Sequence, residues 1–225
     1  MLTISNIEQL FAGGLENLEP EGQLTGIYKR RVPGVVRVGK LGIVGDEHGD
    51  PRVHGGPEKA VHQYAAENYG RLAEAFPQCV DLFVPGSLGE NISSRHMTER
   101  SVHVGDVFRF GTAVLQVSQP RSPCWKINHR FGVERMSMFV AQARITGWYY
   151  RVLQPGKMQE GDEIWLLERQ TQRFSIEQFW QVQMSHRPSI DDLAELAVVP
   201  GLAPEWRQRL EHRAKWLRAQ AGGQA

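Results

Sequence analysis

Hydrophobic and polar residues alternate along short segments of the first two-thirds of the chain, and glycine and proline separate these segments. Period-two alternation in β-branched and aromatic residues is typical of half-buried strands. It predicts strands at residues 36–38, 41–43, 102–110, 113–117, 148–152 and 164–167. Glycine bends recur beside several of these strands, as in Gly105-Asp106 and Gly161-Asp162. Short strands with such bends favour a closed or nearly closed β-barrel.

Two helices are predicted inside this β region, at residues 67–76 and 133–143. The first carries Leu72 and Phe76 on one face and ends before Pro77. The second carries Phe139 and Val140 at helical spacing. Apolar stripes of this kind usually face a core, so we expect both helices to pack against the barrel.

The pattern changes near residue 174, where helical periodicity replaces alternation. Ser175 and Gln178 fit a capping box, Ser189 can cap a second helix, and Pro204 lies near the start of a third. Helices this short are marginal alone and must pack together or on the barrel. We predict a mainly β fold, with a β-barrel domain at 1–172, a three-helix module at 173–219 and a disordered tail at 220–225.

The composition is that of an ordinary soluble globular protein, with 41% hydrophobic and 23% charged residues. The 26 basic and 25 acidic residues give a formal net charge of +1, which suggests neither a nucleic acid polymer nor an anionic membrane as partner. The N-terminus lacks the features of a signal peptide, and no apolar segment is long enough to cross a bilayer. We expect a cytoplasmic protein, and the pattern leaves its oligomeric state open.

Cys124 carries the first candidate chemistry. The only other cysteine is Cys79, so a cysteine-only zinc site is excluded. Cys124 ends the loop Ser-Gln-Pro-Arg-Ser-Pro-Cys at 118–124, which two prolines hold extended. Nearby cations favour thiolate over thiol; they are Arg121, Lys126, His129 and Arg130. A thiolate here can be a nucleophile, a persulfide carrier or a ligand for a soft metal, and the alternative is an ordinary buried cysteine.

Two glycine-rich turns carry further polar candidates. His54-Gly55-Gly56-Pro57 predicts a tight turn with exposed amides, and Lys59 adds a cation, which together make a candidate phosphate cradle. The order of residues is not that of a Walker loop, and a polar turn with a surface lysine is the alternative. In the turn at 86–92, Asn91 can hydrogen-bond a polar heterocycle, although turn chemistry alone also explains it.

These segments resemble the MOSC domain family, named after the C-terminal domain of molybdenum cofactor sulfurase. The matching strings are Gly45-Asp46, Val53-His54-Gly55-Gly56-Pro57-x-Lys59-Ala60-Val61, Gly89-Glu90-Asn91, Val104-Gly105-Asp106 and Ser118-Gln119-Pro120-Arg121-x-Pro123-Cys124. The resemblance spans nearly the whole chain. It is greatest to the YiiM type, in which a three-helix module follows the barrel.

The resemblance implies a barrel that binds the pyranopterin molybdenum cofactor, with Cys124 as the protein ligand to molybdenum. Pyridoxal phosphate is not expected. Thiolate suits molybdenum as a soft donor. The cofactor's phosphate and pterin would then meet a set of polar residues, which are Gly55, Gly56, Lys59, Asn91, Arg121 and, as a weaker phosphate candidate, Lys29. Trp125, bulky beside the metal position, departs from the expected pattern; it either narrows the substrate pocket or packs under the loop.

YiiM-type proteins are associated with the reduction of N-hydroxylated compounds, including hydroxylaminopurine-like base analogues, to amines. The implied substrate is therefore a small N-hydroxylated molecule, and the cofactor carries the redox chemistry. His54 or His48 is the candidate for proton transfer, although His54 can also serve only to brace its turn. The chain has no flavin or dinucleotide fingerprint and too few cysteines for an iron–sulfur cluster, so electrons are expected from a separate reductase.

Other functions remain open from the residues alone. Cys124 can hold a persulfide in a sulfur carrier or sulfurtransferase, or the protein can carry the molybdenum cofactor without catalysis. A barrel that binds RNA is disfavoured by the near-neutral charge. A Cys–His hydrolase has no assignable third residue in the sequence.

Overall fold

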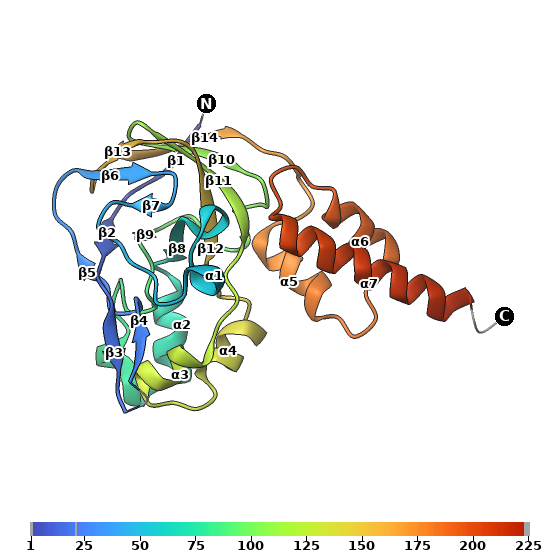
Figure 1. Ribbon diagram of the computed structural model, residues 1–225, viewed down its shortest axis with the longest axis horizontal. Helices are drawn as coiled ribbons and strands as arrows, with labels where there is room; N and C mark the ends of the chain where they lie inside the picture. The colour runs from blue at the N-terminus through green and yellow to red at the C-terminus, as the bar shows by residue number, and fades with distance from the viewer. Residues whose placement is uncertain (1, 21, 223–225) are drawn as a thin grey trace.

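The computed structural model describes residues 2–20 and 22–222 and is built around a nine-stranded sheet (Figure 1). In spatial order the strands are β1 (Leu2–Asn6), β14 (Glu163–Glu168), β10 (Val107–Phe110), β11 (Ala113–Pro120), β12 (Trp148–Gln154), β8 (Val61–Ala65), β9 (Ile92–Ser94), β2 (Gln9–Ala12) and β5 (Arg30–Arg31). Among the described residues, the β8–β9 pair is the only parallel one in this sheet. Irregular register in β1–β14, β10–β14 and β11–β12 bends the sheet.

The closed barrel expected from the glycine bends is not confirmed. In the part of the chain that the structure describes, no hydrogen-bonded pairing joins the edge strands β1 and β5. A second sheet has the order β13 (Gly156–Met158), β6 (Val36–Gly39) and β7 (Gly42–Ile43), and β3 (Glu16–Leu18) pairs with β4 (Gln23–Thr25). The result is a mixed, sheet-rich fold, because local alternation sets strands but not the pairing that would close them.

Alternation predicted most strands correctly. Val36 and Val38 are buried in β6, and Trp148, Tyr150 and Val152 are buried in β12. The predicted strand at 102–110 is shorter than expected, because β10 begins only at Val107 and the preceding residues form a turn.

Four helices lie around the sheets: α1 (Pro51–His54), α2 (Asn68–Ala75), α3 (Trp125–Phe131) and α4 (Met136–Gln142). The predicted helix at 67–76 is α2, and the one at 133–143 is the shorter α4. Helix α3 was not predicted. It begins directly after Cys124 and ends at Gly132, which has the left-handed conformation typical of a C-terminal cap (φ 64°).

The C-terminal region contains the three predicted helices, α5 (Ile176–Met184), α6 (Ile190–Ala197) and α7 (Pro204–Gly222). Ser175 and Gln178 form the expected capping box, and Ser189 caps α6 by accepting from Asp192 N at 3.3 Å. Helix α7 continues through residues 220–222, which the sequence analysis placed in the tail. The rest of that predicted tail, residues 223–225, lies outside the described residues.

The three-helix module shares one hydrophobic cluster with the sheet. Trp206 of α7 lies edge-on to Phe179 of α5, with ring centroids 4.9 Å apart, and both belong to the same cluster as Val102 and Val104. Backbone bonds also cross this junction: Val104 N donates to Phe174 O at 3.0 Å. The module therefore packs against one side of the β region and projects away from it, as Figure 1 shows.

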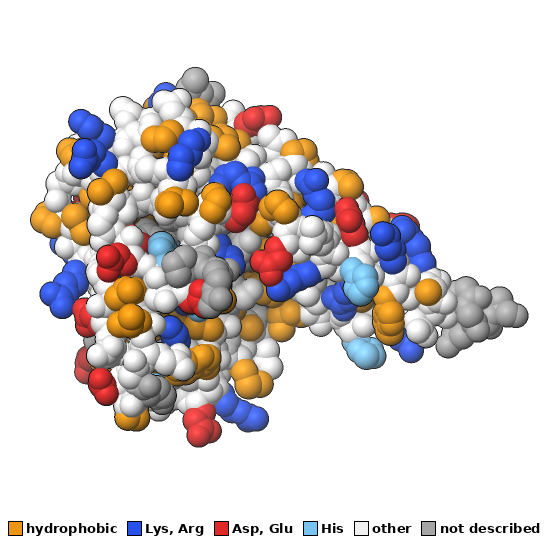
Figure 2. All heavy atoms as spheres, in the orientation of Figure 1, with side chains coloured by type: hydrophobic (Ala, Val, Ile, Leu, Met, Phe, Trp, Pro, Cys, Tyr) orange, Lys and Arg blue, Asp and Glu red, His pale blue; other side chains and the backbone are white. Residues whose placement is uncertain are grey.

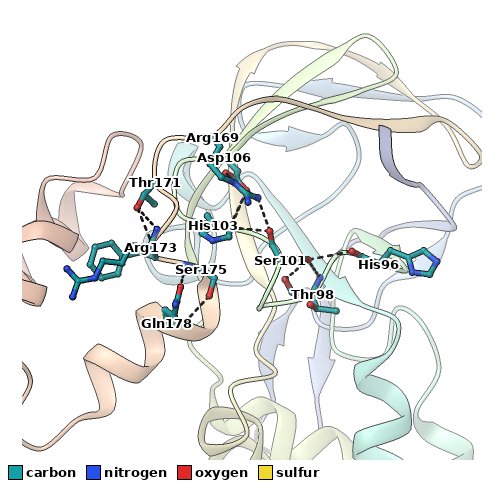
Figure 3. A network of polar contacts seen from close by, with 11 residues as sticks. His96, Thr98, Ser101, His103, Asp106, Arg169, Thr171, Arg173, Ser175 and Gln178 are labelled. Atoms are coloured by element: carbon teal, nitrogen blue, oxygen red, sulfur yellow. Dashed lines mark hydrogen bonds and ion pairs between the residues drawn. The ribbon is translucent and has the colours of Figure 1, made fainter. Parts of the chain in front are cut away.

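A polar network reinforces the junction (Figure 3). Arg169 donates two hydrogen bonds to the buried carboxylate of Asp106, at 3.0 and 2.8 Å, and Asp106 also accepts from His103 N at 2.9 Å. Beside it Gly105 has φ +80°, and a Cβ there would lie 2.1 Å from Pro200 O. The lack of a side chain at Gly105 thus lets the connector before α7 lie close to the turn that precedes β10.

The surface and the helices fit the sequence expectations for charge and hydropathy. On the face shown in Figure 2, lysine and arginine are interspersed with aspartate and glutamate. Among the described residues, no helix has the length and apolar character that crossing a bilayer requires.

Candidate functional site

A single pocket brings together segments that lie far apart in the chain. Its lining residues are Thr25, Gly26, Ile27, His48, Gly49, His54, His62, Leu88, Gly89, Asn91, Arg121, Cys124, Lys126 and Tyr149. The pocket has a cavity volume of about 70 Å³, and all the empty space between its walls, including the part open to solvent, is about 520 Å³. Five of the residues predicted for the site therefore share one pocket: Cys124, Arg121, His54, His48 and Asn91.

Cys124 lies where β11 and its proline loop lead into α3. Its backbone is extended (φ −121°, ψ 166°), and its side chain is half-buried and makes no capping bond. Of the predicted neighbouring cations, Arg121 and Lys126 line the pocket with it. Arg130 instead covers the ring of Tyr28, at 4.7 Å from the ring centroid.

Trp125 does not line the pocket. Its indole is 45% exposed and lies edge-on to His129, with ring centroids 6.3 Å apart. In the structure Trp125 thus neither narrows the pocket nor packs beneath the cysteine loop. The space beside Cys124 is bounded by other side chains.

Arg121 offers an unused hydrogen-bond donor to the pocket. The residue is only 6% exposed, and its backbone N donates to Gly147 O at 3.0 Å. Its Nη1 atom is buried and has no hydrogen-bond partner among the described residues. Because buried polar groups are almost always paired, this nitrogen is suited to an acceptor on a ligand.

The environment of His54 disfavours its charged form. Burial, followed by the cations Lys126, Arg121 and Lys59, lowers the pKa of His54 to about 4. Burial, with a smaller contribution from Arg121, also holds the pKa of His62 well below its ordinary value. Both imidazoles are therefore neutral at neutral pH.

Asn91 and Lys29 are engaged by protein groups. Asn91 Nδ2 donates to Asp46 Oδ2 at 2.8 Å and to Phe11 O at 3.2 Å, while its Oδ1 accepts from His62 N at 2.9 Å. Lys29 forms a buried ion pair with Asp46. Asn91 lies in the pocket wall, but its amide groups connect the surrounding segments, and Lys29 is not free for a phosphate.

The predicted phosphate cradle lies outside this pocket. Gly55, Gly56 and Lys59 line a neighbouring depression, and Lys59 Nζ donates to Val53 O at 2.7 Å. The charge of Lys59 still lowers the pKa of His54. The structure therefore does not bring these three residues together with Cys124.

One wall of the pocket was not predicted from the sequence. It is formed by Thr25, Gly26 and Ile27. This segment crosses the segment that ends at Gly49 at very short range. A Cβ at Gly26 would lie 2.2 Å from Glu47 O, and one at Gly49 would lie 2.4 Å from Leu24 O. Glycine at both positions allows this approach, but no local pattern reveals that the two segments meet.

Lys126, His62 and Tyr149 also line the pocket and were not assigned to it from sequence. Lys126 Nζ donates to Leu24 O at 3.1 Å and so connects α3 to the opposite wall. Burial raises the pKa of Tyr149, which stays protonated at neutral pH. The position of Lys126 two residues after Cys124 was a signal from which its place in the pocket could have been predicted. His62 and Tyr149 lie in β8 and β12, far from Cys124 in the sequence, so no such signal exists for them.

The family model for the MOSC domain matches residues 50–165. The chain belongs to the MOSC domain family. It is 36% identical over 195 residues to Protein YiiM of Escherichia coli (strain K12), covering 86% of each chain. It is also 36% identical to a protein named "Reductase" from Gibberella moniliformis, covering 85% of this chain but 34% of that longer protein.

Solved structures agree with this membership. The crystal structure of YiiM from Escherichia coli matches with a TM-score of 0.77 and 29% identity, covering 95% of this chain and 92% of that one. YiiM from Geobacillus stearothermophilus matches with a TM-score of 0.79 and 29% identity, covering 93% and 99%. The resemblance to the YiiM type inferred from the sequence is therefore confirmed.

Proposed function

We propose that this MOSC-family protein is a molybdenum-cofactor-dependent reductase that converts N-hydroxylated compounds, such as 6-hydroxylaminopurine-type base analogues, to the amines. In this proposal Cys124 is the protein ligand to molybdenum. The observation that carries it is the meeting of a half-buried thiol and an unpaired, buried Arg121 Nη1 in one pocket. A soft metal ligand and a donor for an anionic or carbonyl oxygen are what such a cofactor requires.

The residues present fit the chemistry of the cofactor, and the pocket shape limits how it would lie. A thiolate is a suitable ligand for molybdenum, and the guanidinium of Arg121 can pair with phosphate or pterin oxygens. The cavity volume of about 70 Å³ is well below the roughly 300–1,000 Å³ of typical small-molecule sites. A pyranopterin would therefore extend beyond this cavity towards solvent.

When bound, the cofactor would supply two-electron reduction of the N–O bond. The chain would hold it through Cys124, orient it through Arg121 and present the neutral imidazoles of His54 and His62 at the pocket wall. Electrons would come from a separate reductase, and we propose a cytoplasmic location that keeps the thiol reduced. The name of the relative called "Reductase" supports this class of activity, and this chain matches 34% of that longer protein.

Metal analysis tests the proposal. Protein produced in a host that makes the cofactor should contain molybdenum in stoichiometric amount, and Cys124→Ala should lose it. Cys79→Ala is the matched control, because Cys79 is buried and does not line the Cys124 pocket. Its thiol donates a hydrogen bond to Phe131 O at 3.5 Å. Molybdenum retained in Cys124→Ala, or lost equally in both variants, would contradict the assignment of the ligand.

Two further measurements separate the alternatives. A persulfide on Cys124 without molybdenum, detected by mass spectrometry, would indicate a sulfur carrier or sulfurtransferase instead. Molybdenum without turnover would indicate a cofactor carrier. The reductase proposal expects chemically reduced protein to convert 6-hydroxylaminopurine to adenine in a single-turnover assay.

A further inference from the structure

His48 lies in the Cys124 pocket in a setting unlike that of the other histidines. Its side chain is 20% exposed, and its Nε2 lies 3.9 Å from Asp46 Oδ2, within the range of an ion pair but beyond a direct hydrogen bond. Among the described residues, neither imidazole nitrogen of His48 makes a hydrogen bond. The ring is thus held near a carboxylate while it keeps access to both the pocket and solvent.

The carboxylate of Asp46 is fixed in place. It pairs with Lys29, accepts from Gly13 N at 3.0 Å through Oδ1, and accepts from Asn91 Nδ2 at 2.8 Å through Oδ2. The side chains of Lys29 and Asp46 are only 4% and 1% exposed. Because these partners come from separate segments, the carboxylate cannot turn away from His48 without breaking the network.

The charges around His48 and His54 differ in number: one cation and one carboxylate act on His48, whereas three cations and one carboxylate act on His54. His54 faces the cations Lys126, Arg121 and Lys59, with only Asp50 to oppose them. His48 faces Asp46, which favours the imidazolium, although burial and then Lys29 act in the other direction and lower its pKa overall. The remaining titratable groups that line the pocket are His62, Arg121, Cys124, Lys126 and Tyr149.

We propose that His48 is the proton donor to the departing oxygen of the substrate and that Asp46 positions it, an inference that rests on the proposed reductase function. In that reaction the N–O bond breaks, the oxygen leaves as water and the nitrogen becomes an amine. The reaction consumes two protons and two electrons, which the external reductase would supply. His48 gives one proton to the oxygen and is reprotonated from solvent, which also supplies the other proton.

The activity test uses molybdenum-loaded protein and 6-hydroxylaminopurine. His48→Gln should lower kcat by roughly 100-fold or more, with a smaller change in KM, because general acid catalysis contributes about 10²–10⁴-fold. His212→Gln, on the exposed side of α7, is the control for loss of an unrelated histidine. The rate of the wild type should fall as the pH rises through the His48 titration, and His48→Gln should lose this dependence.

Chemical rescue separates a donor from a wall residue. Added imidazole should restore activity to His48→Gly but not to His54→Gly, since only the first loses the proton donor. Molybdenum content should be the same in His48→Gln and in the wild type. A loss of molybdenum would overturn the inference, because it would make His48 a residue that holds the cofactor.

A measurement without the cofactor tests the role of Asp46. Titration of the His48 imidazole by NMR in cofactor-free protein should show a lower pKa in Asp46→Asn, because the opposing charge is gone. If that variant does not fold, Lys29→Met should raise the same pKa. No change in either variant would overturn the positioning role of Asp46.

The two proposals can fail separately. If the wild type reduces no N-hydroxylated compound, both the proposed function and the role of His48 as proton donor are refuted, whatever the NMR titration shows. If the wild type is active and His48→Gln matches its rate and pH profile, only the donor role falls.

Discussion

Replacing Gly105 with alanine tests how closely the three-helix module is packed on the sheet. A side chain at φ +80° costs about 1–2 kcal/mol, because it clashes with the local backbone. The new Cβ would also lie 2.1 Å from Pro200 O, and overpacking of this kind costs about 1–3 kcal/mol. We therefore expect Gly105→Ala to lower the free energy of unfolding by about 2–5 kcal/mol.

Gly161 provides a matched control. It has φ +87°, and a Cβ there would have no atom within 4 Å, so Gly161→Ala should show only the backbone cost of about 1–2 kcal/mol. Urea unfolding followed by circular dichroism measures both variants. Equal destabilisation would refute the reasoning, because the close approach of the connector before α7 would then cost nothing. A separate early transition of the helices in Gly105→Ala would also contradict the shared core.

Three further predictions concern the pocket and the junction. Asn91→Leu should destabilise the cofactor-free protein by about 2–4 kcal/mol in urea, because Phe11 O, Asp46 and His62 N lose a buried partner. Between pH 6.5 and about 4 the unfolded chain binds a proton at His54 that the folded chain does not, so the free energy of unfolding decreases as the pH is lowered through this range. Thermal unfolding of His54→Gln should show a smaller decrease over the same range. In the structure Trp180 Nε1 donates to Thr146 Oγ1 at 2.9 Å, and Trp180→Phe removes this buried hydrogen bond. The variant should lower the free energy of unfolding, measured in urea, by about 1–3 kcal/mol.

Each of these has a result that would count against it. An Asn91→Leu protein as stable as the wild type without cofactor would mean that Asn91 serves the ligand and not the fold. An unchanged acid dependence in His54→Gln would show that other groups control it. For Trp180, Gln178→Ala in the same helix is a useful comparison, since it removes a capping bond without touching the indole.

Local signals predicted local structure well. The capping box at Ser175 and Gln178 and the alternation in β12 depend on neighbours in sequence, and both were confirmed. Helix α3 was missed because the proline loop before it obscured the start of a seven-residue helix. Closure of the sheet depends on pairing between distant strands, which alternation does not specify.

The site was predicted in part for the same reason. Arg121 lies three residues before Cys124 on one stiff loop, so the sequence predicts that they meet, and both line the pocket. Gly55 and Lys59 follow His54 closely, but the short helix α1 ends at His54, and the next turn lines a different depression. The ion pair between Lys29 and Asp46 joins separate segments of the chain, and no local sequence pattern predicts it.

The wall formed by Thr25, Gly26 and Ile27, together with His48 and Gly49, precedes the stretch 50–165 that defines the family. A change in this part of the chain would therefore reshape the mouth of the pocket and leave the cysteine loop untouched. A comparison of such pockets has to include residues 25–49 as well as the stretch that the family model matches.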